Sequence, residues 1–201
     1  MARKYQQRQR AAHRDKTRGR IVDAALALHG TIGPARTTIT AIAEGAGVER
    51  LTVYRHFPDD LSLFAACGAR FVELHPPPYP GEWAVIPDPV DRLRRTLAAL
   101  YAFYDDNEAM LLNSERDAEL LPQLREALAP FTQYRDAVKV VLASGSAPGG
   151  DFDLRDAALG HALEFPTWQS LVRRQQLTQA EAVELMVRSV MASADRRDWQ
   201  G

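Results

Sequence analysis

The stretch GVERLTVYRHF, residues 47–57, determines how the front of the chain folds. It begins with Gly47, a residue that accepts the positive φ of a tight turn between two helices. Val53 and Phe57 are four positions apart, so a short helix here places both on its buried side. The opposite side then carries long hydrogen-bonding side chains, namely Arg50, Thr52, Tyr54 and His56. Such a group can be a solvated surface, a catalytic cluster or a surface that reads another molecule.

Composition limits the class of protein. The 201 residues are 46% hydrophobic and 25% charged, as in an ordinary globular protein. No apolar run reaches the roughly 18 residues of a membrane span, and no apolar segment follows the basic N-terminus as in a signal peptide. The single cysteine, Cys67, rules out an internal disulfide framework and fits a reducing compartment. We therefore expect a cytoplasmic protein with no membrane partner, in which Cys67 is buried and structural.

Positive charge is concentrated at the N-terminus. Residues 1–20 have a net charge of +7, whereas residues 21–75 have −2 and the remainder −6. A basic tail on a chain of net charge −1 is typical of a protein that meets a polyanion. A tail that only keeps the protein soluble is the alternative.

Helical periodicity extends over most of the chain. Apolar residues recur three and four positions apart from about residue 17, and no run alternates with the period of two that a strand needs. The pattern predicts an all-α fold. We expect a flexible basic arm at 1–16, a helix-turn-helix domain at 17–57, a connecting helix at 58–75 and a helical domain at 76–201.

The helices of the last segment are separated by breakers. Proline-rich residues 75–89 predict a loop that no helix crosses, and SGSAPGGDFD at 144–153 predicts another. Thr178 followed by Glu181 is the pattern of a capping box at the start of the last helix. The expected helices run from Val90 to about residue 104, then over a short piece near Met110, 122–143 with a break at Pro130, 154–175 and 179–195.

The front helices match the helix-turn-helix pattern, which is two short helices joined by a glycine-containing turn. The second helix of such a motif enters the major groove of DNA and needs side chains that bond phosphates and base edges. The outward polar side of residues 50–56 meets this need. We therefore expect double-stranded DNA as a partner.

Three quoted segments also resemble a known family. RIVDAALALHG, TTITAIAEGAGV and TVYRHF, within residues 17–67, are similar to the DNA-binding segment of the tetracycline-repressor (TetR) family of bacterial regulators. The resemblance implies a homodimer that binds a roughly palindromic operator. It also implies a variable helical C-terminal domain that binds a small-molecule effector.

The resemblance implies specific contacts with DNA. Thr38 would touch a phosphate, Arg50 and Thr52 would approach base edges, and Tyr54 and His56 would contact the sugar-phosphate backbone. Arg55 is included in the set, although helical geometry turns it partly away. Two positions depart from the family pattern, because Glu49 replaces a frequent serine and Asp60 a common lysine. We expect Glu49 to favour the positive end of the helix rather than to bind phosphate.

The C-terminal domain is expected to supply the effector site and the dimer contact. An apolar seam runs from Leu154 to Val172 through His161, with Leu163 and Leu171 lying off it, so a second subunit should bury this helix. The final helix would join it through Val183, Met186, Val187 and Val190. A helix that is central in a monomer is the alternative. The side chains available to an apolar effector are Tyr101, Tyr104, Met110, Phe131, Tyr134, Phe165 and Trp168.

Enzymatic chemistry finds little support in the sequence. His161 and Glu164 have no third group to orient them, and no cysteine–histidine cluster or phosphate-binding glycine loop is present. We expect no catalytic residues, no metal and no cofactor. The prediction is a DNA-binding repressor released by a small, largely apolar effector. The alternatives are an activator, a regulator without ligand, or an all-α enzyme or carrier whose front helices are only structural.

Overall fold

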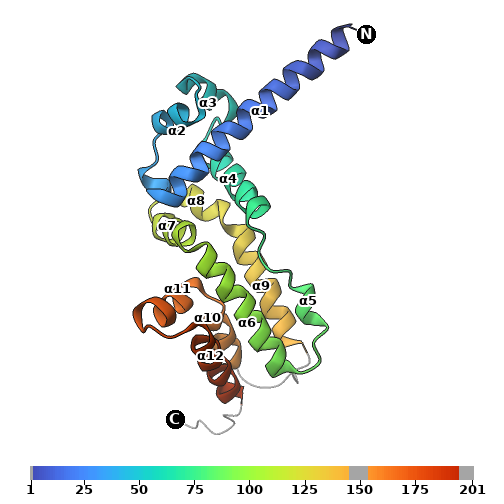
Figure 1. Ribbon diagram of the computed structural model, residues 1–201, viewed down its shortest axis with the longest axis vertical. Helices are drawn as coiled ribbons and strands as arrows, with labels where there is room; N and C mark the ends of the chain where they lie inside the picture. Colours follow the sequence, from blue (N-terminus) through green and yellow to red (C-terminus); the bar gives the residue numbers. More distant parts are fainter. Residues whose placement is uncertain (1, 145–153, 195–201) are drawn as a thin grey trace. The chain divides into compact units, whose positions relative to one another are not determined.

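The computed structural model describes residues 2–144 and 154–194, and every regular element in this part of the chain is a helix (Figure 1). The all-α prediction is confirmed. By contacts the chain divides into two compact units, Met1–Pro76 with Glu108–Ala129, and Pro77–Asn107 with Pro130–Gly201. The elements are α1 Ala2–Thr31, η1 Pro34–Arg36, α2 Ile39–Ala46, α3 Arg50–His56, α4 Asp60–Leu74, α5 Gly81–Ala84, α6 Pro89–Asp106, α7 Glu108–Ala118, α8 Pro122–Ala127, α9 Ala129–Ala143, α10 Leu154–Ala162, α11 Phe165–Gln169, η2 Ser170–Arg174 and α12 Gln179–Ala194.

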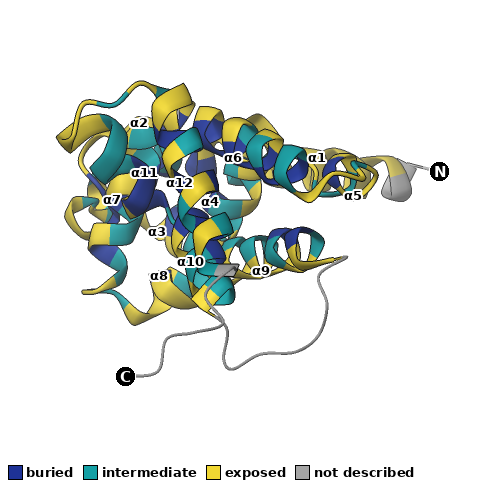
Figure 2. Ribbon diagram, turned by 90° about the horizontal axis from the view of Figure 1, so that it is seen from below, coloured by how far each residue is buried: buried dark blue, intermediate teal, exposed yellow. Residues whose placement is uncertain are grey.

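The first unit has a core between α1 and the three helices that follow it. Figure 2 colours the helices by burial, with the buried residues in dark blue. Cys67 lies in this core, as predicted, and burial raises the pKa of its thiol to about 12. The thiol is therefore protonated and unreactive at neutral pH. The core residues are Ile21, Val22, Ala25, Ile42, Ala43, Ala46, Val53, Phe57, Leu63 and Cys67.

Two boundaries differ from the sequence prediction. Residues 2–16, expected as a flexible arm, are the first half of α1. The segment before Gly19 has no glycine or proline and is rich in alanine, glutamine, lysine and arginine, which favour a helix. In addition, α7 and α8 pack with α1 and α4, so residues 108–129 belong to the first unit and not to one domain at 76–201.

The second unit buries apolar residues of α6 against α12 and α10. The four residues of α12 that were expected to meet a second subunit lie inside this core instead, each less than 8% exposed. Leu163, expected off the seam, is buried as well, whereas Leu154 is exposed. The predicted seam is thus wrong, because the segment 154–175 is not one continuous helix. The four residues are Val183, Met186, Val187 and Val190.

Pro166 explains the break in that segment. Proline has no N–H, so it cannot donate to the carbonyl of Ala162 four residues earlier, as a continuous helix would require. The Tyr101 hydroxyl donates to this carbonyl instead, at 3.0 Å, and the Tyr104 hydroxyl donates to the carbonyl of Leu163 at 2.5 Å. Two buried tyrosines of α6 thereby satisfy the acceptors that the break exposes.

Prolines also mark helix boundaries elsewhere in the chain. α8 and α9 are separated at Leu128, and Pro130 lies in the first turn of α9, so the break predicted at Pro130 is confirmed to within two residues. The proline-rich stretch 75–89 does contain one short helix, α5, which the sequence prediction missed. The predicted loop at 144–153 lies, apart from Ser144, outside the described residues.

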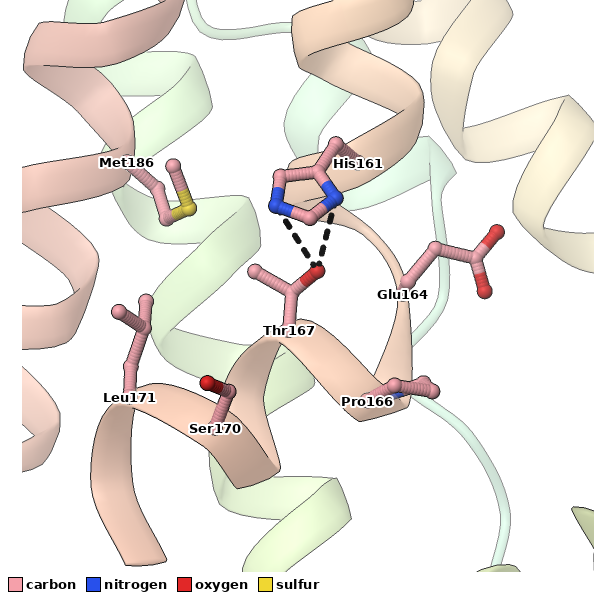
Figure 3. A pocket seen from close by; sticks show the side chains of 7 residues that line it. All are labelled: His161, Glu164, Pro166, Thr167, Ser170, Leu171 and Met186. Atoms are coloured by element: carbon pink, nitrogen blue, oxygen red, sulfur yellow. Dashed lines mark hydrogen bonds between the residues drawn. The ribbon is translucent and has the colours of Figure 1, made fainter. Parts of the chain in front are cut away.

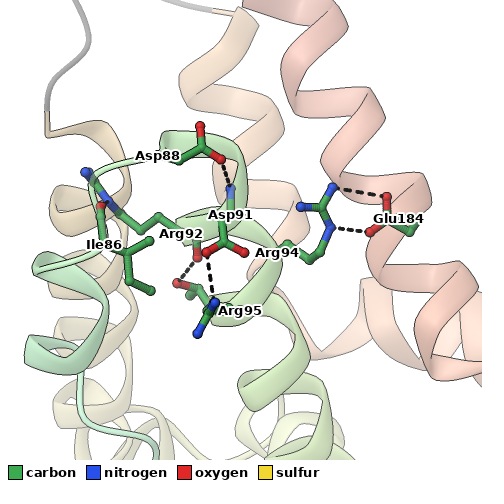
Figure 4. Close-up of polar contacts among 8 residues, drawn as sticks. Ile86, Asp88, Asp91, Arg92, Arg94, Arg95 and Glu184 are labelled. Carbon is green, nitrogen blue, oxygen red and sulfur yellow. Dashed lines mark hydrogen bonds and ion pairs between the residues drawn. The ribbon is translucent and has the colours of Figure 1, made fainter.

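A buried arginine fastens the end of α9. Arg92 is 7% exposed and donates to the carbonyls of Ile86, Val141 and Ser144 at 2.8–3.2 Å. The last two carbonyls lie at the C-terminal end of α9, where a positive charge is favourable. On the same helix, Arg94 forms an ion pair with Glu184 of α12 (Figure 4).

Candidate nucleic-acid interface

The turn between α2 and α3 has the geometry that the sequence predicted. Gly47 lies in the left-handed region, at φ 62° and ψ 45°, and ends α2. Arg20 of α1 donates to the carbonyl of Gly47 at 2.9 Å and also to that of Ala46. Thr38 caps α2, because its hydroxyl oxygen accepts from the Ala41 N–H at 3.1 Å. The hydroxyl proton of this exposed threonine remains able to donate to a phosphate.

Helix α3 turns Val53 into the core and its polar residues outward. Arg50 and Arg55 are exposed, and Tyr54 is 47% exposed. Thr52 is half-buried and accepts a hydrogen bond from Arg55 at 2.8 Å, so these two side chains lie on one side of the helix. The structure therefore brings together the five predicted residues of α3, and Arg55 is more accessible than expected. The fifth, His56, is half-buried at the end of the helix.

One exposed residue of α3 was missed by the sequence reasoning. Leu51 is 65% exposed although it lies between Arg50 and Thr52. A leucine in so short a helix was assigned no role, since only polar side chains were sought. An exposed apolar side chain on a helix that enters the major groove can contact the methyl group of thymine.

The two acidic departures occupy helix starts. Glu49 is the N-cap residue of α3, but its side chain makes no capping hydrogen bond. Asp59 caps α4 by accepting from the Ser62 N–H at 2.7 Å, with Asp60 following in the first turn. Both positions place negative charge at the positive end of a helix, as the sequence analysis expected for Glu49.

Basic side chains of α1 approach the C-terminal end of α3. The Arg18 guanidinium carbon lies 4.2 Å from the centroid of the Phe57 ring, directly after α3. Burial lowers the pKa of His56, and the positive charges of Arg18, Arg14 and Arg55 lower it further, against a small opposing effect of Asp15. The His56 imidazole therefore lies in a locally positive field.

The turn after α1 is fastened by α7. The buried carboxylate of Asp117 accepts from the Ala35 N–H at 2.9 Å and pairs with Arg116 at 2.7 Å. Burial alone would raise the pKa of Asp117, but these hydrogen bonds and the charges of Arg116 and Arg36 lower it overall. Close by, burial lowers the pKa of His29 to about 4, although the charge of Asp117 raises it slightly. Helix α7 thus fastens the turn that directly follows α1, the helix that carries Arg14 and Arg18.

Most of the predicted effector residues form packed structure. Tyr101, Tyr104, Phe165 and Trp168 are fully buried and contact one another. Phe131 and Tyr134 stack on each other along α9, at 6.0 Å between ring centroids. Met110 belongs to the first unit, where its methyl group approaches Gly30. The structure therefore brings six of the seven residues into the second unit but leaves Met110 in the other.

A separate pocket of about 300 Å³ lies in the second unit (Figure 3). It contains none of the seven predicted residues. Its polar side has His161 within 3.2 Å of the Thr167 hydroxyl, and the Glu164 carboxylate is paired with Arg135. One wall is the π-helix η2, and helices of this kind often occur at functional sites. The lining residues are His161, Glu164, Pro166, Thr167, Ser170, Leu171 and Met186.

Comparison with known proteins supports the resemblance. Residues 21–67 match the family model for bacterial regulatory proteins of the tetR family. A tetR-family transcriptional regulator from Streptomyces coelicolor is 21% identical, with 89% of this chain and 80% of that chain covered and a TM-score of 0.64. A TetR-like transcriptional regulator from Rhodococcus sp. RHA1 is 22% identical, with coverages of 90% and 97% and a TM-score of 0.60. At these identities the structures show a shared fold.

A search of curated proteins finds no match. Within the described residues, no helix is long and apolar enough to cross a membrane, and no group of side chains is suited to hold a metal ion. The family match covers residues 21–67, the segment that contains α2, α3 and the turn between them. This segment is therefore similar to the DNA-binding segment of bacterial regulators of the tetR family, and the solved structures share the fold of the whole chain.

Proposed function

We propose that this protein is a repressor that reads a roughly palindromic DNA operator through the outward side of α3. The observation that carries this proposal is the cluster of exposed Arg50, Leu51 and Tyr54 on a short helix behind a left-handed glycine turn. Arg50 and Thr52 would contact base edges, and Thr38 would bind a phosphate beside them. Tyr54, Arg55 and His56 would contact the sugar-phosphate backbone.

Binding to DNA selected from a random-sequence library tests this proposal. Replacing Tyr54 or Thr52 with alanine should weaken binding to the selected duplex by about 1–3 kcal/mol, while circular dichroism stays that of the wild type. Tyr79→Ala is the matched control, because it removes an exposed tyrosine of the second unit. If neither α3 variant loses affinity, α3 is not the reading helix.

We infer that a second subunit and a small, largely apolar effector meet at the pocket of the second unit. Its volume is at the lower end of the range of small-molecule sites. Leu171 and Met186 offer it apolar surface, while His161 and Ser170 offer hydrogen bonds. An effector held between two subunits would change the separation of the two reading helices. It would release the operator by its difference in affinity for the two dimer states.

Sedimentation tests the dimer directly. Wild-type protein at micromolar concentration should run as a dimer of 22.4 kDa chains. Leu171→Glu, which adds a charge to a half-exposed position of the pocket, should produce monomers with greatly reduced affinity for the palindromic site. Leu154→Glu is the control, because it charges an exposed leucine that does not line the pocket. A wild-type monomer that still binds the operator tightly would exclude the dimer mechanism.

A further inference from the structure

Two arginines of α1 lie on the same side of the helix near the end of α3. Arg14 and Arg18 are four residues apart, so their side chains follow one another along one face. Arg18 is anchored over the Phe57 ring at 4.2 Å. The side chain of Arg14 is 75% exposed. In addition to burial, the positive charges of Arg18 and Arg14 both lower the pKa of His56. Charged groups from two separate helices therefore converge at one place in the first unit.

This convergence of like charges is poorly neutralised. Asp15 is 4.0 Å from Arg14, but both side chains are more than 70% exposed, so their attraction is weak. In the described part of the chain, no carboxylate lies within 4.0 Å of the guanidinium of Arg18 or Arg55. The helix dipole explains basic residues in the last turn of α3. It does not explain Arg14 and Arg18, which come from another element.

We propose that Arg14 and Arg18 of α1 form, together with Arg55 and His56 of α3, a single site for backbone phosphates of bound DNA. The proposal rests on the proposed function, because it takes α3 to lie in the major groove. Guanidinium groups suit this role, since they bind phosphate oxygens through two parallel hydrogen bonds. The first half of α1 is then a second DNA-binding element that grips the strand at the edge of the groove.

A coupled uptake of one proton follows from the same geometry. In the free protein burial, and in addition the positive field of Arg18, Arg14 and Arg55, disfavour the protonated form of His56 and lower its pKa, which Asp15 only partly offsets. A bound phosphate reverses the sign of this field and favours the imidazolium form. DNA binding should therefore become tighter as the pH falls through the range in which histidine titrates.

The salt dependence of binding to a mixed-sequence DNA duplex tests the site. Each phosphate contact contributes about 0.9 to the slope of log affinity against log salt concentration. Arg14→Ala and Arg18→Ala should each flatten this slope by about that amount. Lys16→Ala should leave it unchanged, because it removes one charge from the same exposed segment but on the opposite side of α1. Equal effects of Arg14→Ala and Lys16→Ala would overturn the proposal.

The pH dependence gives an independent readout. Wild-type affinity should rise between about pH 8 and about pH 6, and His56→Gln should abolish most of this rise. An unchanged rise in the variant would exclude His56 from the site. Failure of the proposed function is distinguishable, because Tyr54→Ala would then bind selected DNA as the wild type does. If only the phosphate site is wrong, Tyr54→Ala still binds the selected DNA more weakly than the wild type does. In that case the salt slopes of Arg14→Ala and Lys16→Ala are equal.

Discussion

Replacing His29 with leucine should remove a specific part of the acid sensitivity of this protein. The imidazole is buried next to the Phe64 ring, at 5.7 Å between centroids, and burial lowers its pKa from 6.5 to about 4. In the unfolded chain the same group takes up a proton below about pH 6.5. The unfolded state therefore binds more protons between these two values, and the folded state loses stability as the pH falls through this window.

The size of the effect follows from the two pKa values. Between pH 7 and pH 4.5 the shift removes about 2 kcal/mol from the free energy of unfolding. The His29→Leu variant should lack this contribution, because leucine packs in the same space without titrating. Carboxylates titrate in this range too, so the difference between the wild type and the variant is the informative quantity.

Urea denaturation of the full-length chain at both pH values measures this difference. His75→Leu is the control, since it removes an exposed imidazole of the same unit. On acidification from pH 7 to pH 4.5, the free energy of unfolding of the wild type and of the control should fall by about 2 kcal/mol more than that of His29→Leu. Equal losses in all three proteins would refute the assignment of His29 as a neutral buried group.

Three further substitutions test local features of the fold by thermal denaturation. Gly47→Ala should cost about 1–2 kcal/mol, because the left-handed conformation strains any residue with a Cβ and the new methyl group would meet Arg20 at 2.9 Å. Arg92→Met should lower the free energy of unfolding by about 3 kcal/mol, because it leaves the buried carbonyls at the end of α9 without a donor. An unchanged stability would mean that water donates to these carbonyls in place of the arginine. Thr178→Ala should cost about 1 kcal/mol by removing the cap of α12, whereas Thr31→Ala, away from any N-cap, should change little.

The local signals in the sequence predicted the structure well. The glycine turn at residue 47, the cap at Thr38 and the capping box of Thr178 with Glu181 all have the expected hydrogen bonds or dihedral angles. Each of these features depends on residues within four positions of one another. The outward side of α3 follows in the same way, because the positions of Val53 and Phe57 determine which side is buried.

Features that depend on distant residues could not be predicted in this way. From the sequence, the apolar side of α12 that bears Val183 and Val187 is equally compatible with a subunit contact and with the core of one subunit. In the structure this side is buried and α12 packs against α6, so it belongs to the core. Residues 108–129 join the first unit through contacts that include Asp117, whose carboxylate accepts from the Ala35 N–H across 82 positions. Nothing near Asp117 in the sequence marks this partner.

The tyrosines of α6 show why an aromatic residue is a poor guide to a ligand site. Tyr101 and Tyr104 were expected to contact an effector, but the Tyr101 hydroxyl donates to the Ala162 carbonyl, which Pro166 leaves without its helical partner, and the Tyr104 hydroxyl donates to the next carbonyl, that of Leu163. The cause and the response are about sixty residues apart, so neither segment reveals the pairing alone. If this account is correct, Tyr101→Phe should destabilise the second unit even without any effector, because the buried carbonyl of Ala162 loses its donor. Restoring the missing N–H with Pro166→Ala should reduce the loss in the double variant, since a continuous helix could then form. Additive losses in the two single variants and the double variant would show that the tyrosine and the proline act independently.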